Sequence, residues 1–258
     1  DFVGFTRLAS RISPNELVHG LNRIFSHFDD VSLRHGLERI KTMGDSYMCA
    51  GGVLTEQPDH LVRSILVGLE MLDVVDREGM RGPDGTPWRM RVGLHIGPVV
   101  AGVVGRRNFA FDLWGDAVNV ASRMESHAQA GTINLATDVY EIVERFFIAE
   151  ERGTIPVRGK GPMGMSQITR LRPRYSFDEN GRLPNDEFHS ALETWLEEQG
   201  TSSPKPMEPL VPDASLDVSV SDFDPLNAFA MLIPEDHDRL RELAEETAIG
   251  EGDVLFHE

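Results

Sequence analysis

Apolar and polar residues follow two different periods along the first 172 residues of the chain. Four stretches repeat apolar side chains every three or four residues, which predicts amphipathic helices over residues 14–36, 59–77, 115–128 and 137–147. Shorter alternating or wholly apolar runs between them predict β-strands. These runs are residues 37–42, 46–50, 88–95, 99–104, 109–113 and 132–135, with two more within 148–170. Interleaved helices and strands predict an α/β or α+β domain with helices covering a sheet.

The pattern changes after Pro173. Residues 185–199 predict a short acidic helix, and residues 201–222 are rich in Ser, Pro, Asp and Val, as is typical of a linker. Residues 223–258 contain one further candidate helix and a final apolar run. We therefore divide the chain into a domain at 1–172, a helix and linker at 173–222, and the start of a second module at 223–258.

Composition narrows the classes of function. The net charge of −17 argues against a nucleic-acid partner, because binding phosphate chains needs basic surface. A nucleotide site would need a local basic pocket or a metal. The single cysteine, Cys49, excludes an intramolecular disulfide and fits a reducing compartment, so we expect a cytoplasmic domain. No apolar run is long enough to span a membrane, and no signal peptide is present. A start at Asp1 and an end within a pattern predict a piece of a longer polypeptide.

Residues 39–48 read as a β-hairpin with its turn at Met43-Gly44. Asp45 lies at this turn and Lys41 four residues before it, so a phosphate ligand could reach both. A purely structural turn is the alternative, because hairpin turns favour Gly and Asp for backbone reasons.

Two carboxylates, Asp1 and Asp45, each stand at a strand edge beside a turn. If they converge they could hold Mg²⁺, which prefers oxygen ligands. The turn at Gly4 into a helix start, with Thr6 as its N-cap, could cradle phosphate on free N–H groups. The alternative is that Asp1 is merely a chain end and Asp45 a turn former.

Residues 109–126 are the second dense stretch of candidate chemistry. On a helix starting near Gly115, Asn119 and Arg123 are one turn apart and share a face, while Val118, Val120 and Met124 can face the core. An amide and a guanidinium so placed suit a sugar and a phosphate. An ordinary solvated helix face is the alternative. Trp114 is expected in the core, and His95 is expected to be a strand residue satisfied locally.

Arg158-Gly159-Lys160-Gly161 puts two cations on a glycine-rich turn, which suits a triphosphate; a plain hairpin turn is the alternative.

Together these stretches resemble the class III nucleotide cyclase catalytic domain, the adenylyl and guanylyl cyclase family. The resemblance covers residues 1 to about 170, and its motifs occur in the family's order. They are Asp1-Phe2-Val3-Gly4-Phe5-Thr6, Lys41-Thr42-Met43-Gly44-Asp45, Gly93-Leu94-His95-Ile96-Gly97-Pro98-Val99, Asp112-Leu113-Trp114-Gly115, Val118-Asn119-Val120-Ala121-Ser122-Arg123-Met124 and Arg158-Gly159-Lys160-Gly161.

The resemblance implies a ferredoxin-like class III cyclase fold with an antiparallel-rich sheet, whose strand before Asp1 is missing from this sequence. It implies a homodimer with shared sites at the interface. It assigns metal binding to Asp1, Phe2 and Asp45, the purine to Lys41 and Asp112, the transition state to Asn119 and Arg123, and the triphosphate to Gly4, Phe5, Thr6, Arg158 and Lys160.

By the same resemblance the substrate is ATP, the metals are Mg²⁺ or Mn²⁺, two per site, and the products are cyclic AMP and pyrophosphate for signal transduction. A guanylate cyclase and a catalytically silent, dimeric regulatory module are the alternatives.

Arg158 stands where the family usually has lysine. Residues 236–258 weakly resemble the start of a cyclic-nucleotide-binding domain, with a generic helix and strand as the alternative. Regulatory domains, and any membrane attachment, are expected in the missing parts of the parent chain.

Overall fold

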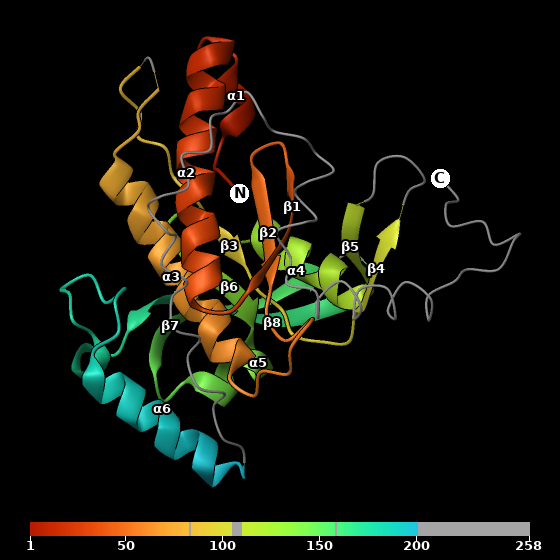
Figure 1. Cartoon of the computed structure of the whole chain (residues 1–258), viewed down its shortest axis with the longest axis vertical. Helices are drawn as coiled ribbons and strands as arrows, with labels where there is room; N and C mark the ends of the chain where they lie inside the picture. Colours follow the sequence, from red (N-terminus) through yellow and green to blue (C-terminus); the bar gives the residue numbers. More distant parts are fainter. Residues whose placement is uncertain (83, 105–109, 158, 201–258) are drawn as a thin grey trace, which may run out of the picture. The chain divides into compact units, whose positions relative to one another are not determined.

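The computed structural model describes residues 1–82, 84–104, 110–157 and 159–200 (Figure 1). The described residues divide into two compact units. The larger unit combines Asp1–Val99 with residues 115–200, and the smaller contains the hairpin strands at 100–104 and 110–114. Arg158, Pro83 and the expected linker and second module at 201–258 lie outside the described residues.

The larger unit is built on a four-stranded sheet with the strand order β3-β6-β8-β7. The β3 and β6 strands are parallel, whereas β6–β8 and β8–β7 are antiparallel. The predicted antiparallel-rich sheet is therefore confirmed. The strands are β3 (Val92–Gly93), β6 (Ile133–Ala136), β7 (Phe147–Val157) and β8 (Gly161–Leu171).

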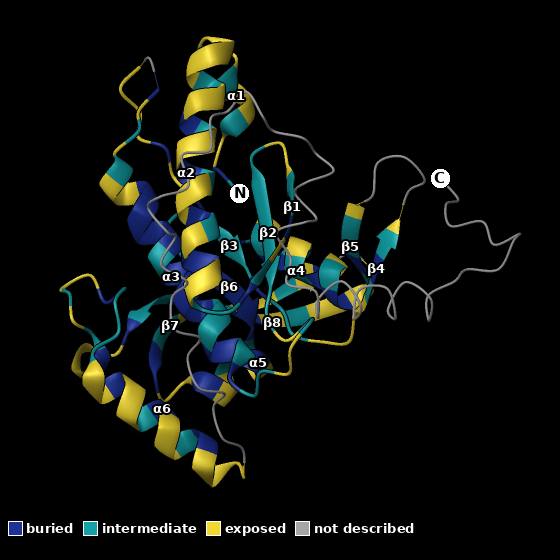
Figure 2. Ribbon diagram, in the orientation of Figure 1, coloured by how far each residue is buried: buried dark blue, intermediate teal, exposed yellow. Residues whose placement is uncertain are grey.

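Helix α3 is the centre of the core. Twelve of its 19 residues are buried, on more than one side, as Figure 2 shows by its dark blue ribbon. Gly68 lets the helix approach the sheet, because a Cβ there would stand 2.7 Å from a methyl group of Ile133. The helices of this unit are α1 (Phe5–Ala9), α2 (Pro14–Arg34), α3 (His60–Glu78), α4 (Asp116–Ser126), α5 (Thr137–Val143) and α6 (Asp186–Glu198).

Helix α2 starts where local chemistry requires it. Ser13 and Glu16 form a capping box, and Pro14 occupies the first turn, where its missing N–H costs nothing. Only one stripe of α2 is buried, including Ile24, Phe28 and Val31, so the helix covers the core with its other face in solvent. The helix predicted at 14–36 is confirmed.

Residues 88–95 form a shorter strand than predicted. Only Val92–Gly93 pair with β6, and Met90 instead forms an isolated bridge with Phe2. The backbone N–H of Arg91 donates to the Asp1 carbonyl at 3.0 Å. The first residues of the chain thus pair with one edge of residues 89–91, while Met90 and Val92 bond to Gly131 and Thr132 on the other edge.

The residues after β8 pack on the same core. A 3-10 turn, η1 (Pro173–Tyr175), leads to α6, which is capped by the Asn185 side chain. Phe188 on α6 meets Phe146 with ring centroids 5.4 Å apart, and Leu192 and Leu196 are also buried. The predicted helix is confirmed, while the domain boundary at 172 stays a prediction.

Two hairpins complete the described chain. In the first, β1 (Glu38–Met43) pairs with β2 (Ser46–Ala50), so the turn is Gly44-Asp45 and not the expected Met43-Gly44. The reason is that Met43 pairs with Ser46 and Gly44 takes the positive φ of 63°. The second, in the smaller unit, pairs β4 (Val100–Val104) with β5 (Ala110–Trp114). Among the described helices, none combines the length and apolar character needed to cross a bilayer.

Candidate active site

The two carboxylates predicted to bind metal lie side by side. The Asp45 carboxylate accepts a hydrogen bond from the Phe2 backbone N–H at 3.3 Å. In the reverse direction, the Ser46 hydroxyl donates to the Asp1 carboxylate at 2.8 Å. This crossed pair of bonds ties the chain start to the β1–β2 turn. We call Asp1, Asp45 and these supporting residues the carboxylate corner.

Arg91 is a member of the carboxylate corner that sequence reasoning missed. Its guanidinium lies 3.3 Å from the Asp1 carboxylate and 2.6 Å from that of Glu125 on α4. The three side chains are 27%, 19% and 21% exposed, so the group is largely shielded from water. In the sequence, Arg91 stands two residues before the motif that begins at Gly93. This position alone does not indicate that Arg91 contacts Asp1 and Glu125.

Gly93 explains how α4 reaches this corner. A Cβ at Gly93 would overlap the backbone of Glu125 and the carbonyl of Ala121, so only glycine permits the helix to lie on β3. The buried Asn134 side chain then donates to the Met124 carbonyl at 2.8 Å. Backbone contact, not side-chain packing alone, therefore sets the position of α4.

Asn119 is exposed and Arg123 half-buried, one turn apart on α4, as expected. The buried residues of the helix are Ala117, Val120 and Met124, so Ala117 and not the expected Val118 completes the core stripe. No hydrogen bond or ion pair engages the Asn119 amide or the Arg123 guanidinium within the described part of the chain. We call these two residues the α4 face; their polar groups are available to a ligand or a partner.

Lys160 lies beside the first turn of α4. Its ammonium forms an ion pair with Asp116 in the first turn of α4. Both side chains are well exposed, at 38% and 63%, so an incoming phosphate can replace the Asp116 carboxylate at little cost. Its expected companion Arg158 lies outside the described residues.

The turn at Gly4 differs from the expectation. Gly4, with φ of 72°, is the N-cap of α1, and the expected cap Thr6 lies inside the helix without a capping bond. The physical reason is that Gly4 adopts the left-handed conformation at no steric cost and its carbonyl starts the helix. Thr6 is exposed and Phe5 half-buried beside the carboxylate corner.

The two residues expected to read the purine are on different units. Lys41 lies half-buried on β1, in the larger unit. Asp112 lies on β5 opposite Gly102, in the smaller unit, and its carboxylate accepts the Leu113 N–H at 2.8 Å. Their pairing on one base therefore stays a prediction.

His95 was expected to be satisfied locally, and this was wrong. Its Nδ1 is buried and has no hydrogen-bond partner among the described residues. Burial lowers the pKa of His95 below its usual value, because the charged imidazolium would lose hydration, although the charges of Asp138 and Asp116 act in the opposite direction. The short β3 ends before His95, which removes the strand contacts that the prediction assumed.

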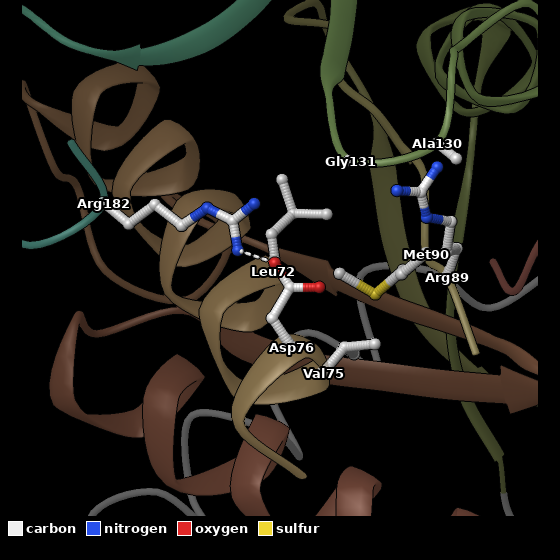
Figure 3. A pocket seen from close by; sticks show the side chains of 8 residues that line it. All are labelled: Leu72, Val75, Asp76, Arg89, Met90, Ala130, Gly131 and Arg182. Atoms are coloured by element: carbon white, nitrogen blue, oxygen red, sulfur yellow. Dashed lines mark hydrogen bonds and ion pairs between the residues drawn. The ribbon is translucent and has the colours of Figure 1, made fainter. Parts of the chain in front are cut away.

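One partly enclosed hollow on the larger unit lies away from this site. Figure 3 shows a pocket of about 70 Å³ between α3 and the Ala130-Gly131 turn. Its rim carries an ion pair of 2.6 Å between Arg182 and Asp76. None of the residues predicted to bind nucleotide lines it.

The carboxylate corner suits a hard divalent cation. Its two carboxylates are oxygen ligands, which Mg²⁺ and Mn²⁺ prefer, while the Phe2 carbonyl, the third predicted ligand, accepts the Phe5 N–H at 3.4 Å. Within the described residues, no three His, Cys, Asp or Glu side chains gather. Water and substrate phosphate would have to complete the coordination shell, as is usual for Mg²⁺.

The mixed helix–sheet domain thus carries two neighbouring carboxylates at one corner and an Asn/Arg pair on one helix. The chain belongs to the adenylate and guanylate cyclase catalytic domain family, whose model matches residues 1–170. An adenylate cyclase of Mycobacterium tuberculosis is 50% identical over 163 residues, which cover 63% of this chain and 36% of that relative. The matched segment thus spans about a third of the length of this curated relative.

Solved structures agree on the fold. The guanylate cyclase domain of RhGC from Catenaria anguillulae, in complex with GTP, is 32% identical with a TM-score of 0.62, covering 67% of this chain and 93% of that chain. A non-canonical dimeric guanylyl cyclase domain of the RhoGC fusion protein from Blastocladiella emersonii is 29% identical with a TM-score of 0.59, with coverage of 67% and 93%. The matched part of the chain therefore has the class III cyclase fold.

Proposed function

We propose that this chain is an adenylate cyclase that converts ATP to 3′,5′-cyclic AMP and pyrophosphate. The observation that carries the proposal is the carboxylate corner, where Asp1 and Asp45 are held together by bonds from Ser46 and Phe2. Two acids that could simply repel each other are instead fixed by donors, as a metal site requires. The family and the relative named as an adenylate cyclase point to the same chemistry.

The reaction is an in-line displacement at phosphorus. The ribose 3′-oxygen forms a bond to the α-phosphorus, the bond from that phosphorus to the bridging oxygen breaks, and pyrophosphate leaves. The 3′-hydroxyl proton passes to solvent. Divalent ions, when bound, lower the pKa of this hydroxyl and neutralise phosphate charge. No protein nucleophile is needed, since positioning and electrostatics dominate phosphoryl transfer.

The residues of this chain divide the remaining work. Asp1 and Asp45, oriented by their donors, hold the cations. Arg123 neutralises charge on the reacting phosphoryl oxygens, and Asn119 hydrogen-bonds the ribose. Lys160 leaves its ion pair with Asp116 and binds the terminal phosphates instead. Arg158 and the Gly4–Thr6 turn also contact the triphosphate. Arg91, a cation beside Asp1, adds positive charge where the phosphates approach.

The choice of ATP over GTP rests on Lys41 and Asp112. Adenine offers an acceptor at N1 and a donor at N6, which fit an ammonium and a carboxylate; guanine reverses this polarity at O6 and N1. Guanylate cyclase is kept as the second candidate, because one similar structure holds GTP.

We further propose that the chain acts as a homodimer with two equivalent sites. The α4 face has no partner within its described chain, and one similar guanylyl cyclase domain forms a dimer, although a non-canonical one. In each site, one protomer would supply the carboxylate corner and its partner the α4 face and the purine-reading pair.

Product analysis tests the activity. The purified protein is incubated with Mn²⁺ and either ATP or GTP, and the nucleotides are separated by chromatography. We expect cyclic AMP from ATP and much less cyclic GMP from GTP. A folded dimer that forms neither product would overturn the proposal, and cyclic GMP alone would replace it with the second candidate.

Mixed dimers test the sharing of sites. Asp45→Ala chains are combined with Arg123→Ala chains, each inactive alone. Half of the random dimers then contain one intact site of two, so activity recovers to about a quarter of the wild-type value. Absence of any recovery, with mixed dimers demonstrated by tagged pull-down, contradicts a site made from two chains.

A further inference from the structure

An open cleft lies where the family-matched region gives way to the residues that follow it. It has a volume of about 480 Å³, and three of its four lining residues are arginines: Arg145, Arg172 and Arg174, with Pro173. Arg145 stands between α5 and β7, and the other two follow β8. We call these three residues the arginine cleft; it shares no residue with the candidate active site.

The arginines are fixed in place by contacts that leave charge available. The Arg172 Nε donates to the Glu144 carbonyl at 2.9 Å, which satisfies a carbonyl after the end of α5. The Arg174 guanidinium lies over the Tyr175 ring at 4.3 Å and donates to its hydroxyl at 2.6 Å. Arg145 lies over the Phe146 ring at 5.6 Å. Because these side chains are already held in place, ligand binding would cost little side-chain entropy.

Neutralisation of this charge is incomplete. Arg145 pairs with Glu198 at 3.0 Å, but these side chains are 43% and 54% exposed, and such surface pairs are weak. Over the described parts of the chain, no carboxylate pairs with Arg172 or Arg174. The rest of the molecule is strongly acidic, with a net charge of −17. Three guanidinium groups around one hollow are thus a local exception to the charge of the protein.

We propose that the arginine cleft binds a polyphosphate group, supplied either as free inorganic polyphosphate or as the phosphate chain of a nucleotide. Guanidinium forks bind phosphate oxygens in pairs, and three of them match a ligand with several phosphates better than a single anion. The cleft is open, so the remainder of a nucleotide can project into solvent. These contacts use one nitrogen of Arg172, and one nitrogen and one face of Arg174, so the remaining N–H groups can bind phosphate.

Occupation would link two parts of the larger unit. Arg145 precedes β7, and Arg172 and Arg174 begin the segment that leads to α6, so one ligand contacts both. A ligand that binds only the folded chain raises its stability, by an amount that grows with the logarithm of the ligand concentration above the Kd. The cleft therefore offers a way for polyphosphate to stabilise the folded larger unit without entering the active site.

The test uses inorganic triphosphate as the probe, with isothermal titration calorimetry at low salt and with EDTA. All proteins carry Arg123→Ala and Lys160→Ala, so that binding at the active site is suppressed. The reference is compared with Arg172→Gln/Arg174→Gln and with Arg172→Lys/Arg174→Lys. The matched control is Arg23→Gln/Arg34→Gln, which removes the same charge from exposed ion pairs on α2. A parallel series with ATP distinguishes the nucleotide from the free anion.

We expect the glutamine pair to weaken triphosphate binding by about tenfold or more, since it removes several charge-assisted hydrogen bonds. The lysine pair should keep part of the affinity, and the α2 control should keep nearly all of it. Unchanged affinity in the glutamine pair, or an equal loss in the α2 control, overturns the proposal. Circular dichroism verifies folding; if the glutamine pair unfolds, Arg174→Gln alone, which removes no backbone bond, decides by the same criteria.

Discussion

The carboxylate corner and the α4 face belong to the same unit, but they differ in whether their polar side chains have hydrogen-bond partners within the chain. In the corner, each carboxylate is held by a donor from a distant segment, Ser46 for Asp1 and the Phe2 N–H for Asp45. On the α4 face, Asn119 and Arg123 have no hydrogen-bond or ion-pair partner in the described residues. One region is organised before any ligand arrives, whereas the other is completed by what binds to it.

The difference has a physical reason. Two neighbouring carboxylates repel each other, and donors must fix them before a cation can use both. A solvated amide and guanidinium on a rigid helix carry no such penalty, and the helix itself fixes their spacing. Substitutions in the two regions should therefore separate metal binding from catalysis.

The largest expected effect comes from removing one charged group in each region. Asp45→Ala and Arg123→Ala should each lower kcat by about 10² to 10³-fold, as single electrostatic groups do in other enzymes. Measuring the melting temperature with and without Mn²⁺ distinguishes them. Mn²⁺ should stabilise the wild type and Arg123→Ala, but not Asp45→Ala. If both variants lose the Mn²⁺ response, the contrast between the regions is wrong.

A smaller loss is expected from moving α4 without touching its polar residues. In Gly93→Ala the new methyl group overlaps the Glu125 backbone, so the helix must shift and the protein should lose about 3 kcal/mol of stability. Urea unfolding gives the free energy, and kcat should fall with it. Ser122→Ala, an exposed change on the same helix, is the control and should alter neither value. A fully stable Gly93→Ala would show that this close approach does not position α4.

The smallest effect tests the connection between the two regions. Arg91 contacts both Asp1 and Glu125, so Arg91→Ala releases Asp1 and removes a cation near the phosphates. We expect kcat/KM for ATP to fall by about tenfold, the scale found when a supporting residue of a metal site is lost. Arg23→Ala, which breaks an exposed pair with Glu78, should leave kcat/KM unchanged. Equal values for Arg91→Ala and wild type would make the corner independent of α4.

Local patterns predicted the elements well because each depends on neighbours in the sequence. The apolar stripe of α2 lies within the 21 residues of the helix, and its capping box is formed by Ser13, directly before the helix, and Glu16 in its first turn. The β1–β2 and β7–β8 hairpins join strands that follow each other directly, so short loops decide their pairing. Errors of one or two residues occurred at the Gly4 cap and the β1–β2 turn, and the strand predicted over 88–95 was shortened because Met90 bridges Phe2 rather than a residue of β6.

The sequence alone determined the order of helices and strands, the spacing of Asn119 and Arg123 on one helix face, and the presence of the cyclase motifs. All of these depend on residues close together in the chain. Only the tertiary structure decided that Ser46 supports Asp1, that Arg91 joins Asp1 to Glu125, and that three arginines line one cleft. Asp1 and Arg91 are 90 positions apart. No local propensity encodes such a contact, because it exists only after the sheet and α4 have packed together.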